Sequence, residues 1–170
     1  MIRALGAALL TAGCGSLGLS AVNQLSGRVR DLRELSSGLE ILQRELGWRL
    51  SPLPGALEAA AGGTHGRAAQ FFACCARGAR RLDGAPFRTL WSGALEGCPL
   101  RLNREDRALL ERLGPVLGRY DGESQRQAVE EVLAGLDRQQ VQAEDNRRRL
   151  GRVYAVLGLT AGLFLSLVLI

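Results

Sequence analysis

Residues 26–50 read SGRVRDLRELSSGLEILQRELGWRL, and this stretch decides the fold. Its apolar residues recur at steps of three and four, which places them on one face of an α-helix. The stripe consists of Val29, Leu32, Leu35, Leu39, Leu42, Leu46 and Leu50. Charged and small residues occupy the other positions, so we expect a helix that buries one side and exposes the other.

Further helices are predicted on the C-terminal side of this stretch, with Pro and Gly residues between them. They are expected at about residues 54–61, 67–82, 86–97, 103–118 and from 122 onward. Asn103 with Asp106 is a typical N-cap pattern for the fourth of these. No stretch requires a β-strand, so the sequence predicts an all-α bundle of about six helices.

The length and the charge of the chain limit the classes of protein to which it can belong. The chain has 170 residues, which suits one ordinary domain of about 100 to 200 residues. All 22 basic residues are Arg, and with 17 acidic residues they give a net charge of +5. The basic residues are interspersed with acidic ones, whereas nucleic-acid binding needs denser clustering. We therefore expect no nucleic-acid partner.

Both ends of the chain are free of charge. Residues 4–25 and 153–170 contain no Asp, Glu or Arg, and about 20 apolar helical residues suffice to cross a bilayer. The sequence therefore predicts a helical bundle over 26–152 flanked by transmembrane helices at 4–25 and 153–170. A cleaved secretory signal, or lipoprotein processing at Cys14, is the alternative for the first segment.

The Arg residues beside the two apolar segments predict their orientation, because cytoplasmic flanks collect positive charge. They are Arg28, Arg30 and Arg33 after the first segment, and Arg147, Arg148, Arg149 and Arg152 before the second. Both flanks lie within 26–152. This range is therefore expected in the cytosol, with the two termini on the other side of the membrane.

Small residues recur at every fourth position in both apolar segments, which places them on one helix face. The candidates for helix packing in the membrane are Ala8, Ala12 and Ser16 in the first segment, and Gly158, Gly162 and Ser166 in the second. Such faces allow close helix approach in lipid. The alternative is that apolar segments are simply rich in Gly and Ala.

The sequence contains only weak matches to motifs for catalysis or cofactor binding. Residues 13–18 match the dinucleotide fingerprint GxGxxG, but the fingerprint needs a βαβ unit and the segment that follows is helical. His65 is the one histidine and has no nucleophile or acid at motif spacing. Cys74, Cys75 and Cys98 lack zinc-site spacing. We expect no metal, no cofactor and no enzymatic activity.

A group of basic residues is a candidate surface for an acidic protein or for acidic headgroups. It comprises Arg77, Arg80, Arg81 and Arg88. The alternative is an ordinary solvated helix face.

Residues 117–125 read LGRYDGESQ, and Leu117, Gly118, Asp121 and Gln125 form an LGxxD pattern followed by Gln. With the turn PLPGAL at 52–57 and Gly158 at the start of the terminal apolar segment, the chain resembles the stage III sporulation protein AB family. The resemblance implies a helical cytosolic domain similar to the platform protein of type II secretion and type IV pilus systems. It also implies a place in the channel between mother cell and forespore.

The resemblance further implies a location in the mother-cell membrane around the forespore, beside a secretion-type ATPase and other channel proteins of the same operon. The favoured hypothesis is a non-enzymatic platform whose bundle docks that ATPase, and a homo-oligomer is compatible with it. One alternative is a membrane-anchored assembly factor without ATPase contact. Another is a membrane-tethered enzyme that uses His65 or the cysteines.

Overall fold

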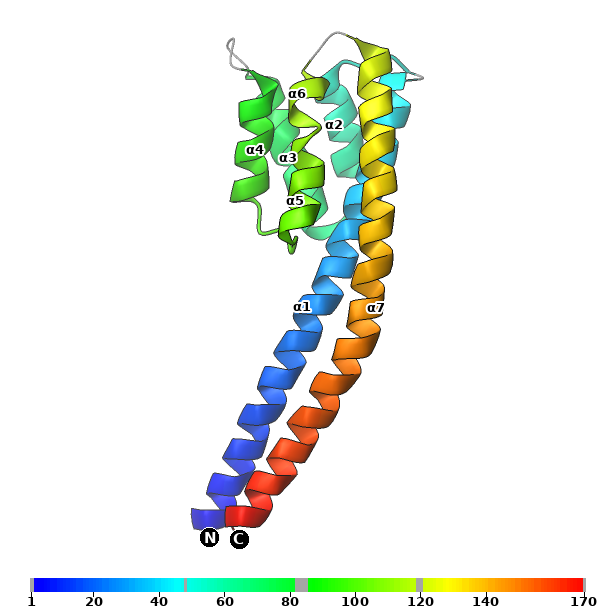
Figure 1. Ribbon diagram of the computed structural model, residues 1–170. Coiled ribbons are helices and arrows are strands. Elements are labelled where there is room, and N and C mark those ends of the chain that lie inside the picture. Colours follow the sequence, from blue (N-terminus) through cyan, green and yellow to red (C-terminus); the bar gives the residue numbers. More distant parts are fainter. Residues whose placement is uncertain (1, 48, 82–85, 119–120, 170) are drawn as a thin grey trace. The chain divides into compact units, whose positions relative to one another are not determined.

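The computed structural model describes residues 2–47, 49–81, 86–118 and 121–169, and many side chains at the two ends of the chain lie outside this description. All regular elements in the described ranges are helices (Figure 1). They are α1 (Ile2–Gly47), α2 (Leu53–Gly62), α3 (Gly66–Ala79), α4 (Phe87–Gly97), α5 (Arg104–Glu111), α6 (Gly114–Leu117) and α7 (Gly122–Leu169). The prediction that the chain is all-helical is confirmed for these residues.

The predicted transmembrane helices at 4–25 and 153–170 require correction. Among the described residues, no helix combines the length and the apolar character that crossing a bilayer demands. In both places the predicted segment is one end of a longer helix, α1 or α7, whose other part carries many charged residues. The predicted fold class is therefore wrong in its two flanking spans.

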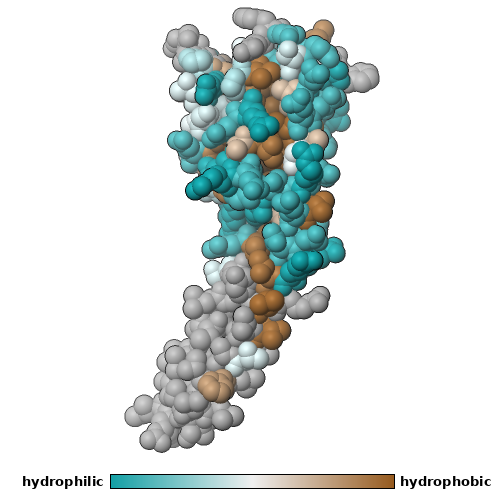
Figure 2. Space-filling view, in the orientation of Figure 1, coloured by the Kyte–Doolittle hydropathy of each residue, from teal (hydrophilic) through white to brown (hydrophobic). Residues whose placement is uncertain are grey.

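The chain divides into two compact units. One contains Met1–Val29 together with Gln142–Ile170, and the other contains Arg30–Val141. The first unit consists of the N-terminal part of α1 and the C-terminal part of α7, which run side by side (Figure 1). On α7, the described side chains of Leu150, Val153, Val156 and Phe164 are exposed, whereas Ala143 is buried. In the second unit, hydrophilic side chains cover most of the face in view (Figure 2).

The leucine stripe of α1 is buried as predicted, except at its end. Leu32, Leu35, Leu39 and Leu42 have no exposed surface. Leu50 is 83% exposed, because α1 ends at Gly47 and the backbone of Leu50 adopts a positive φ of 49°. A side chain in that left-handed conformation no longer follows the helical face. The prediction for Leu50 is therefore wrong.

The predicted helix at 103–118 is two helices in the structure. The predicted cap is confirmed, since the Asn103 side chain accepts a hydrogen bond from the Asp106 amide at 2.7 Å. The Asp106 carboxylate in return accepts one from the Asn103 amide at 2.9 Å, which completes a capping box. Pro115 cannot donate to the preceding turn, so α5 ends at Glu111 and α6 starts anew at Gly114.

The core of the Arg30–Val141 unit is built around Trp91 of α4. Its ring lies edge-on to Phe71 at a centroid distance of 4.9 Å and is tilted against Phe87 at 5.9 Å. The indole Nε1 donates to the Leu110 carbonyl at 2.8 Å. These contacts join α3, α4 and α5 through a single side chain.

Two acidic residues of α1 hold loops of the same unit. The buried Asp31 carboxylate accepts from the Arg101 amide at 2.8 Å. One turn later, the Glu34 carboxylate accepts from the His65 amide at 2.8 Å. The loops before α3 and α5 are thereby fixed to the leucine-striped helix.

Candidate interaction surface

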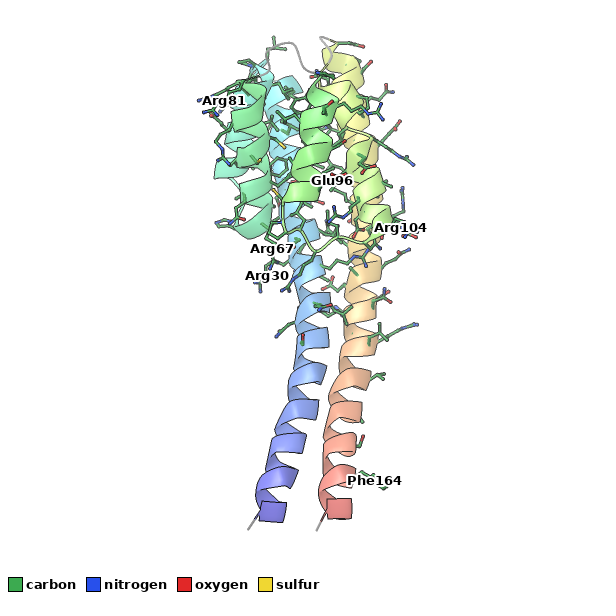
Figure 3. The ribbon with its side chains drawn as sticks, turned by 90° about the vertical axis from the view of Figure 1, so that its left-hand side faces the viewer. Arg30, Arg67, Arg81, Glu96, Arg104 and Phe164 are labelled. Carbon is green, nitrogen blue, oxygen red and sulfur yellow. The ribbon has the colours of Figure 1, made fainter. Side chains whose placement is uncertain are left out.

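The predicted basic residues lie on the hairpin formed by α3 and α4. Arg77 is in the last turn of α3, Arg80 caps its C-terminus and Arg81 follows, whereas Arg88 is in the first turn of α4. The two helices pack together, and Figure 3 shows Arg81 at the outer edge of this pair. We call these four residues the Arg edge. The structure therefore brings Arg80, Arg81 and Arg88 to one end of the hairpin, with Arg77 one turn away.

The charges of the Arg edge are compensated to different degrees. Arg80 forms an ion pair with Glu58 of α2 at 2.6 Å. Arg77, Arg81 and Arg88 are exposed and have no ion pair with the carboxylates that the structure describes. Among the described residues, only Arg80 of the Arg edge therefore has a carboxylate partner, and Asp83, which lies between Arg81 and Arg88 in the sequence, is outside the description.

The helix dipoles stabilise two arginines of the Arg edge but disfavour a third. Cations at a helix C-terminus are favourable, so Arg77 and Arg80 are suited to their place on α3. Arg88 is at a helix N-terminus, where the dipole disfavours positive charge, and the first turn of α4 contains no acidic residue. Local helix stability therefore does not account for Arg88.

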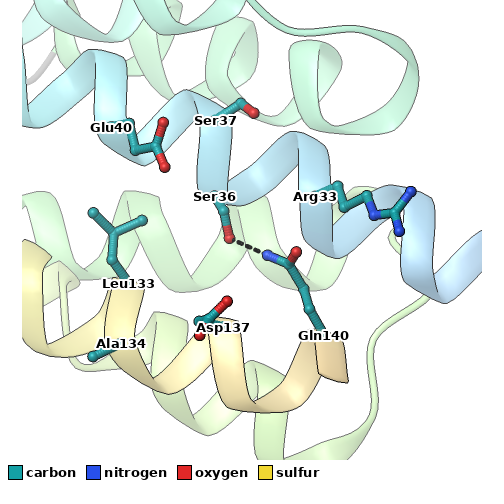
Figure 4. Close-up of a pocket in the computed structure, with 8 residues that line it drawn as sticks. All are labelled: Arg33, Ser36, Ser37, Glu40, Leu133, Ala134, Asp137 and Gln140. Atoms are coloured by element: carbon teal, nitrogen blue, oxygen red, sulfur yellow. Dashed lines mark hydrogen bonds between the residues drawn. The ribbon is translucent and has the colours of Figure 1, made fainter. Parts of the chain in front are cut away.

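A polar groove of about 550 Å³ lies between α1 and α7 within the Arg30–Val141 unit (Figure 4). The Gln140 amide donates to the Ser36 hydroxyl across it at 2.7 Å. Glu40 and Asp137 contribute carboxylates from opposite walls. The residues that line it are Arg33, Ser36, Ser37, Glu40, Leu133, Ala134, Asp137 and Gln140.

Sequence reasoning missed this groove. Its one sequence signature is the pair of small residues Ser36 and Ser37 on the polar side of the leucine-striped helix, which leaves space above the backbone. Only the packing of α7 against that side shows that the space faces a second helix. The lining contains two serine hydroxyls but neither histidine nor cysteine, so no imidazole base or thiol is among the groups that it offers.

The LGxxD motif and its Gln join α6 to the start of α7. Leu117 is buried, and the backbone of Gly118 passes so close to Phe87 that an added Cβ would be 2.9 Å from that residue. The Asp121 carboxylate accepts from the Glu123 amide at 3.3 Å and from the Ser124 hydroxyl. These hydrogen bonds satisfy the first turn of α7, as an N-cap does.

Gln125 is the last residue of the motif. Its side chain is buried and its amide donates to the Leu117 carbonyl at 3.1 Å, back across the loop. The hydrogen bond from Ser124 also lowers the pKa of Asp121, which keeps the cap ionised. The motif residues therefore set the position at which α7 begins, which is a structural task.

The residues considered for catalysis are not assembled into a reactive site. The His65 side chain is 87% exposed, and its Nδ1 lies 3.6 Å from a Glu34 carboxylate oxygen. Burial raises the pKa of the Cys75 thiol, which disfavours the reactive thiolate. Within the described ranges, no group of three or more His, Cys, Asp or Glu residues is arranged to hold a metal ion.

A known protein family matches nearly the whole chain. The profile of the family described as stage III sporulation protein AB matches residues 3–170. The chain belongs to this family. The resemblance inferred from the sequence is thereby confirmed, and membership assigns the protein to sporulation.

A solved structure supports the fold. It is titled stage III sporulation protein AB (SpoIIIAB), and it matches with a TM-score of 0.65 at 23% identity over 71% of this chain and 96% of that one. At this identity the likeness shows the fold alone. The comparison with curated proteins finds no match.

The small residues predicted to pack in the membrane fall outside the described side chains. These are Ala8, Ala12, Ser16, Gly158, Gly162 and Ser166. Their role in helix packing stays a prediction.

Replacing Gln125 with Ala is expected to lower the free energy of unfolding by about 1–2 kcal/mol, because a buried carbonyl loses its donor. Urea unfolding of the full-length protein, followed by circular dichroism, measures the change. Gln127→Ala is the matched control, since Gln127 is exposed on the same turn and should change stability by less than about 0.5 kcal/mol. Equal losses in the two variants would contradict the structural task of the motif.

Proposed function

We propose that this protein is a non-enzymatic platform component of the sporulation channel between mother cell and forespore. Its helical bundle docks a secretion-type ATPase, and it works beside other channel proteins of the same operon at the mother-cell membrane around the forespore. Self-association into a homo-oligomer is compatible with this role. Family membership supports the link to sporulation, and the rest is our proposal.

The observation that supports the docking part is the exposed positive charge of the Arg edge. Three guanidinium groups, those of Arg77, Arg81 and Arg88, are exposed on one hairpin without a described ion-pair partner. Arg side chains are enriched at protein interfaces and bind carboxylates in a bidentate geometry. An acidic surface on the ATPase is the partner chemistry that fits.

The test is the binding of the full-length protein to its cognate ATPase, measured at low and at physiological salt. We expect the double variant Arg81→Glu/Arg88→Glu to weaken binding at least about tenfold, because like charges face one another at the interface. Binding of the unchanged protein should also weaken with added salt. Sporulation efficiency of the same strains connects the affinity to function.

The matched control is Arg104→Glu/Arg138→Glu. Both residues are exposed, and both lie in the Arg30–Val141 unit away from the α3–α4 hairpin. The two double variants change the net charge equally, so a general charge effect would weaken both alike. Binding that survives in the Arg81/Arg88 variant would reject the Arg edge as the docking surface. If the unchanged protein fails to bind the ATPase while sporulation is normal, ATPase docking is rejected and an assembly factor without that contact is favoured.

A further inference from the structure

The turn between α1 and α2, which includes the first part of the PLPGAL motif, presents apolar side chains to solvent. Leu50 is 83% exposed and Pro52 is exposed, while Leu53 and Pro54 are half-exposed. All of them belong to the Arg30–Val141 unit. These residues form a small apolar surface that the core of the unit does not cover, and we call residues 49–54 the α1–α2 turn.

The backbone of Leu50 has a conformation that leucine rarely adopts. Its φ is +49°, and among the described residues it is the one non-glycine with a positive φ. The Cβ crowds the backbone in this left-handed region, so Gly or Asn is the usual residue there. The exposed side chain gains almost no core packing in return. Neither backbone geometry nor burial accounts for a leucine at this position.

The α1–α2 turn is held firmly although it is exposed. The Glu45 carboxylate accepts a hydrogen bond from the Ser51 hydroxyl at 2.9 Å and forms an ion pair with Arg49 at 3.2 Å. The Glu45 carbonyl accepts from the Ser51 amide at 3.0 Å, and the ring of Pro52 fixes its own φ. Both neighbours of Leu50 are thereby fixed to α1. A side chain presented on a rigid turn loses little conformational entropy when it binds a partner.

The α1–α2 turn lies at the same end of the unit as the Arg edge. Figure 1 shows α1 ending and α4 beginning at this end, and Arg88 is in the first turn of α4. The ion pair between Arg80 and Glu58 joins the end of α3 to α2, the helix that follows the turn. A protein that covers this end of the unit therefore contacts both the Arg edge and the turn.

We propose that Leu50 is the apolar anchor of the interface with the secretion-type ATPase and inserts into an apolar pocket of that protein. The inference rests on the proposed docking and extends it from charged residues to an apolar one. Interfaces depend on a few buried anchors inside a polar rim, and the Arg edge supplies the rim. The pocket then covers a leucine that neither the backbone nor the core of the free protein favours.

The experiment compares the affinities of full-length Leu50→Asn and of the unchanged protein for the cognate ATPase. Asn tolerates a positive φ and is close to Leu in size, so this variant keeps the turn and replaces only its apolar surface. We expect binding to weaken about tenfold or more, as on loss of an anchor residue, while the midpoint of urea unfolding stays equal or rises. Leu50→Gly also suits the backbone and should give the same two results. A lower unfolding midpoint in both variants would show a packing role instead and overturn the proposal.

Val141→Gln is the matched control, because Val141 is another exposed apolar residue of the same unit. A Cβ at Gly47 would lie 3.9 Å from Arg126, so the start of α7 is beside the end of α1, and Val141 is about 22 Å further along α7. This variant should bind the ATPase as the unchanged protein does.

The remaining outcomes separate the anchor from the docking itself. Normal binding by Leu50→Asn, together with weak binding by Arg81→Glu/Arg88→Glu, would overturn the anchor and leave docking through the Arg edge intact. An unchanged protein that does not bind the ATPase would overturn both. Loss of self-association instead of ATPase binding in Leu50→Asn would assign the turn to contacts between copies of the chain, which also overturns the proposal.

Discussion

Replacing Trp91 with Ala is expected to lower the free energy of unfolding by about 3–5 kcal/mol, the range for truncating a large buried aromatic side chain. The side chain has no exposed surface and contacts the rings of Phe71 and Phe87. Its removal leaves a cavity where α3, α4 and α5 meet, and the Leu110 carbonyl loses a donor at 2.8 Å. Urea unfolding of the full-length protein measures the loss.

Trp91→Phe tests the contribution of the indole hydrogen bond to this loss of stability, and Leu50→Ala is the control. Trp91→Phe keeps most of the ring but loses the indole donor, so its cost should be near the range for one buried hydrogen bond, about 1–3 kcal/mol. Leu50→Ala also truncates a large apolar residue, but at a position that is 83% exposed. It should change stability by less than about 0.5 kcal/mol. A similar loss in Leu50→Ala and Trp91→Ala would show that the aromatic cluster is not the centre of the core.

Replacing Gly38 with Leu is expected to cost about 3 kcal/mol, at the upper end of the range for overpacking. A Cβ at Gly38 would lie 2.1 Å from Cε2 and 2.6 Å from Cζ of Phe72. Phe72 is fully buried and its ring is rigid, so α1 and α3 would have to separate. Helix propensity acts in the opposite direction but contributes only about 1 kcal/mol.

Gly93→Leu is the matched control for Gly38→Leu. Gly93 is also inside a helix, α4, but no atom lies within 4 Å of a Cβ built there. This variant should be neutral or more stable by up to about 1 kcal/mol, because Leu has the higher helix propensity. Thermal unfolding of both variants checks the contrast, and a destabilised Gly93→Leu with a normal Gly38→Leu would contradict the packing of α1 on α3.

Local patterns predicted most of the helices correctly. The leucine stripe, the breaks at Pro and Gly and the cap at Asn103 all depend on residues within a turn or two of one another. Such patterns do not show where a continuous helix passes from one compact unit to another, as α1 and α7 do. Length and freedom from charge predict a membrane span at each end of the chain, and the described helices do not support these spans.

The candidate surface was predicted only in part. The sequence identified the four arginines, but the ion pair between Arg80 and Glu58 joins residues of two helices and depends on how they pack. The groove beside Ser36 was missed for the same reason, since its opposite wall comes from α7. The LGxxD motif was recognised as a family mark, whereas its work as a cap became visible only with the hydrogen bonds of Asp121 and Gln125.

The sequence by itself determined that the chain is helical, where most helices break and to which family it belongs, because periodicity and motif order are properties of neighbouring residues. The tertiary structure alone decided which charges are compensated and which glycines have no room for a side chain. These properties arise between helices that are distant in the chain, and residue spacing carries no information about the distance between them.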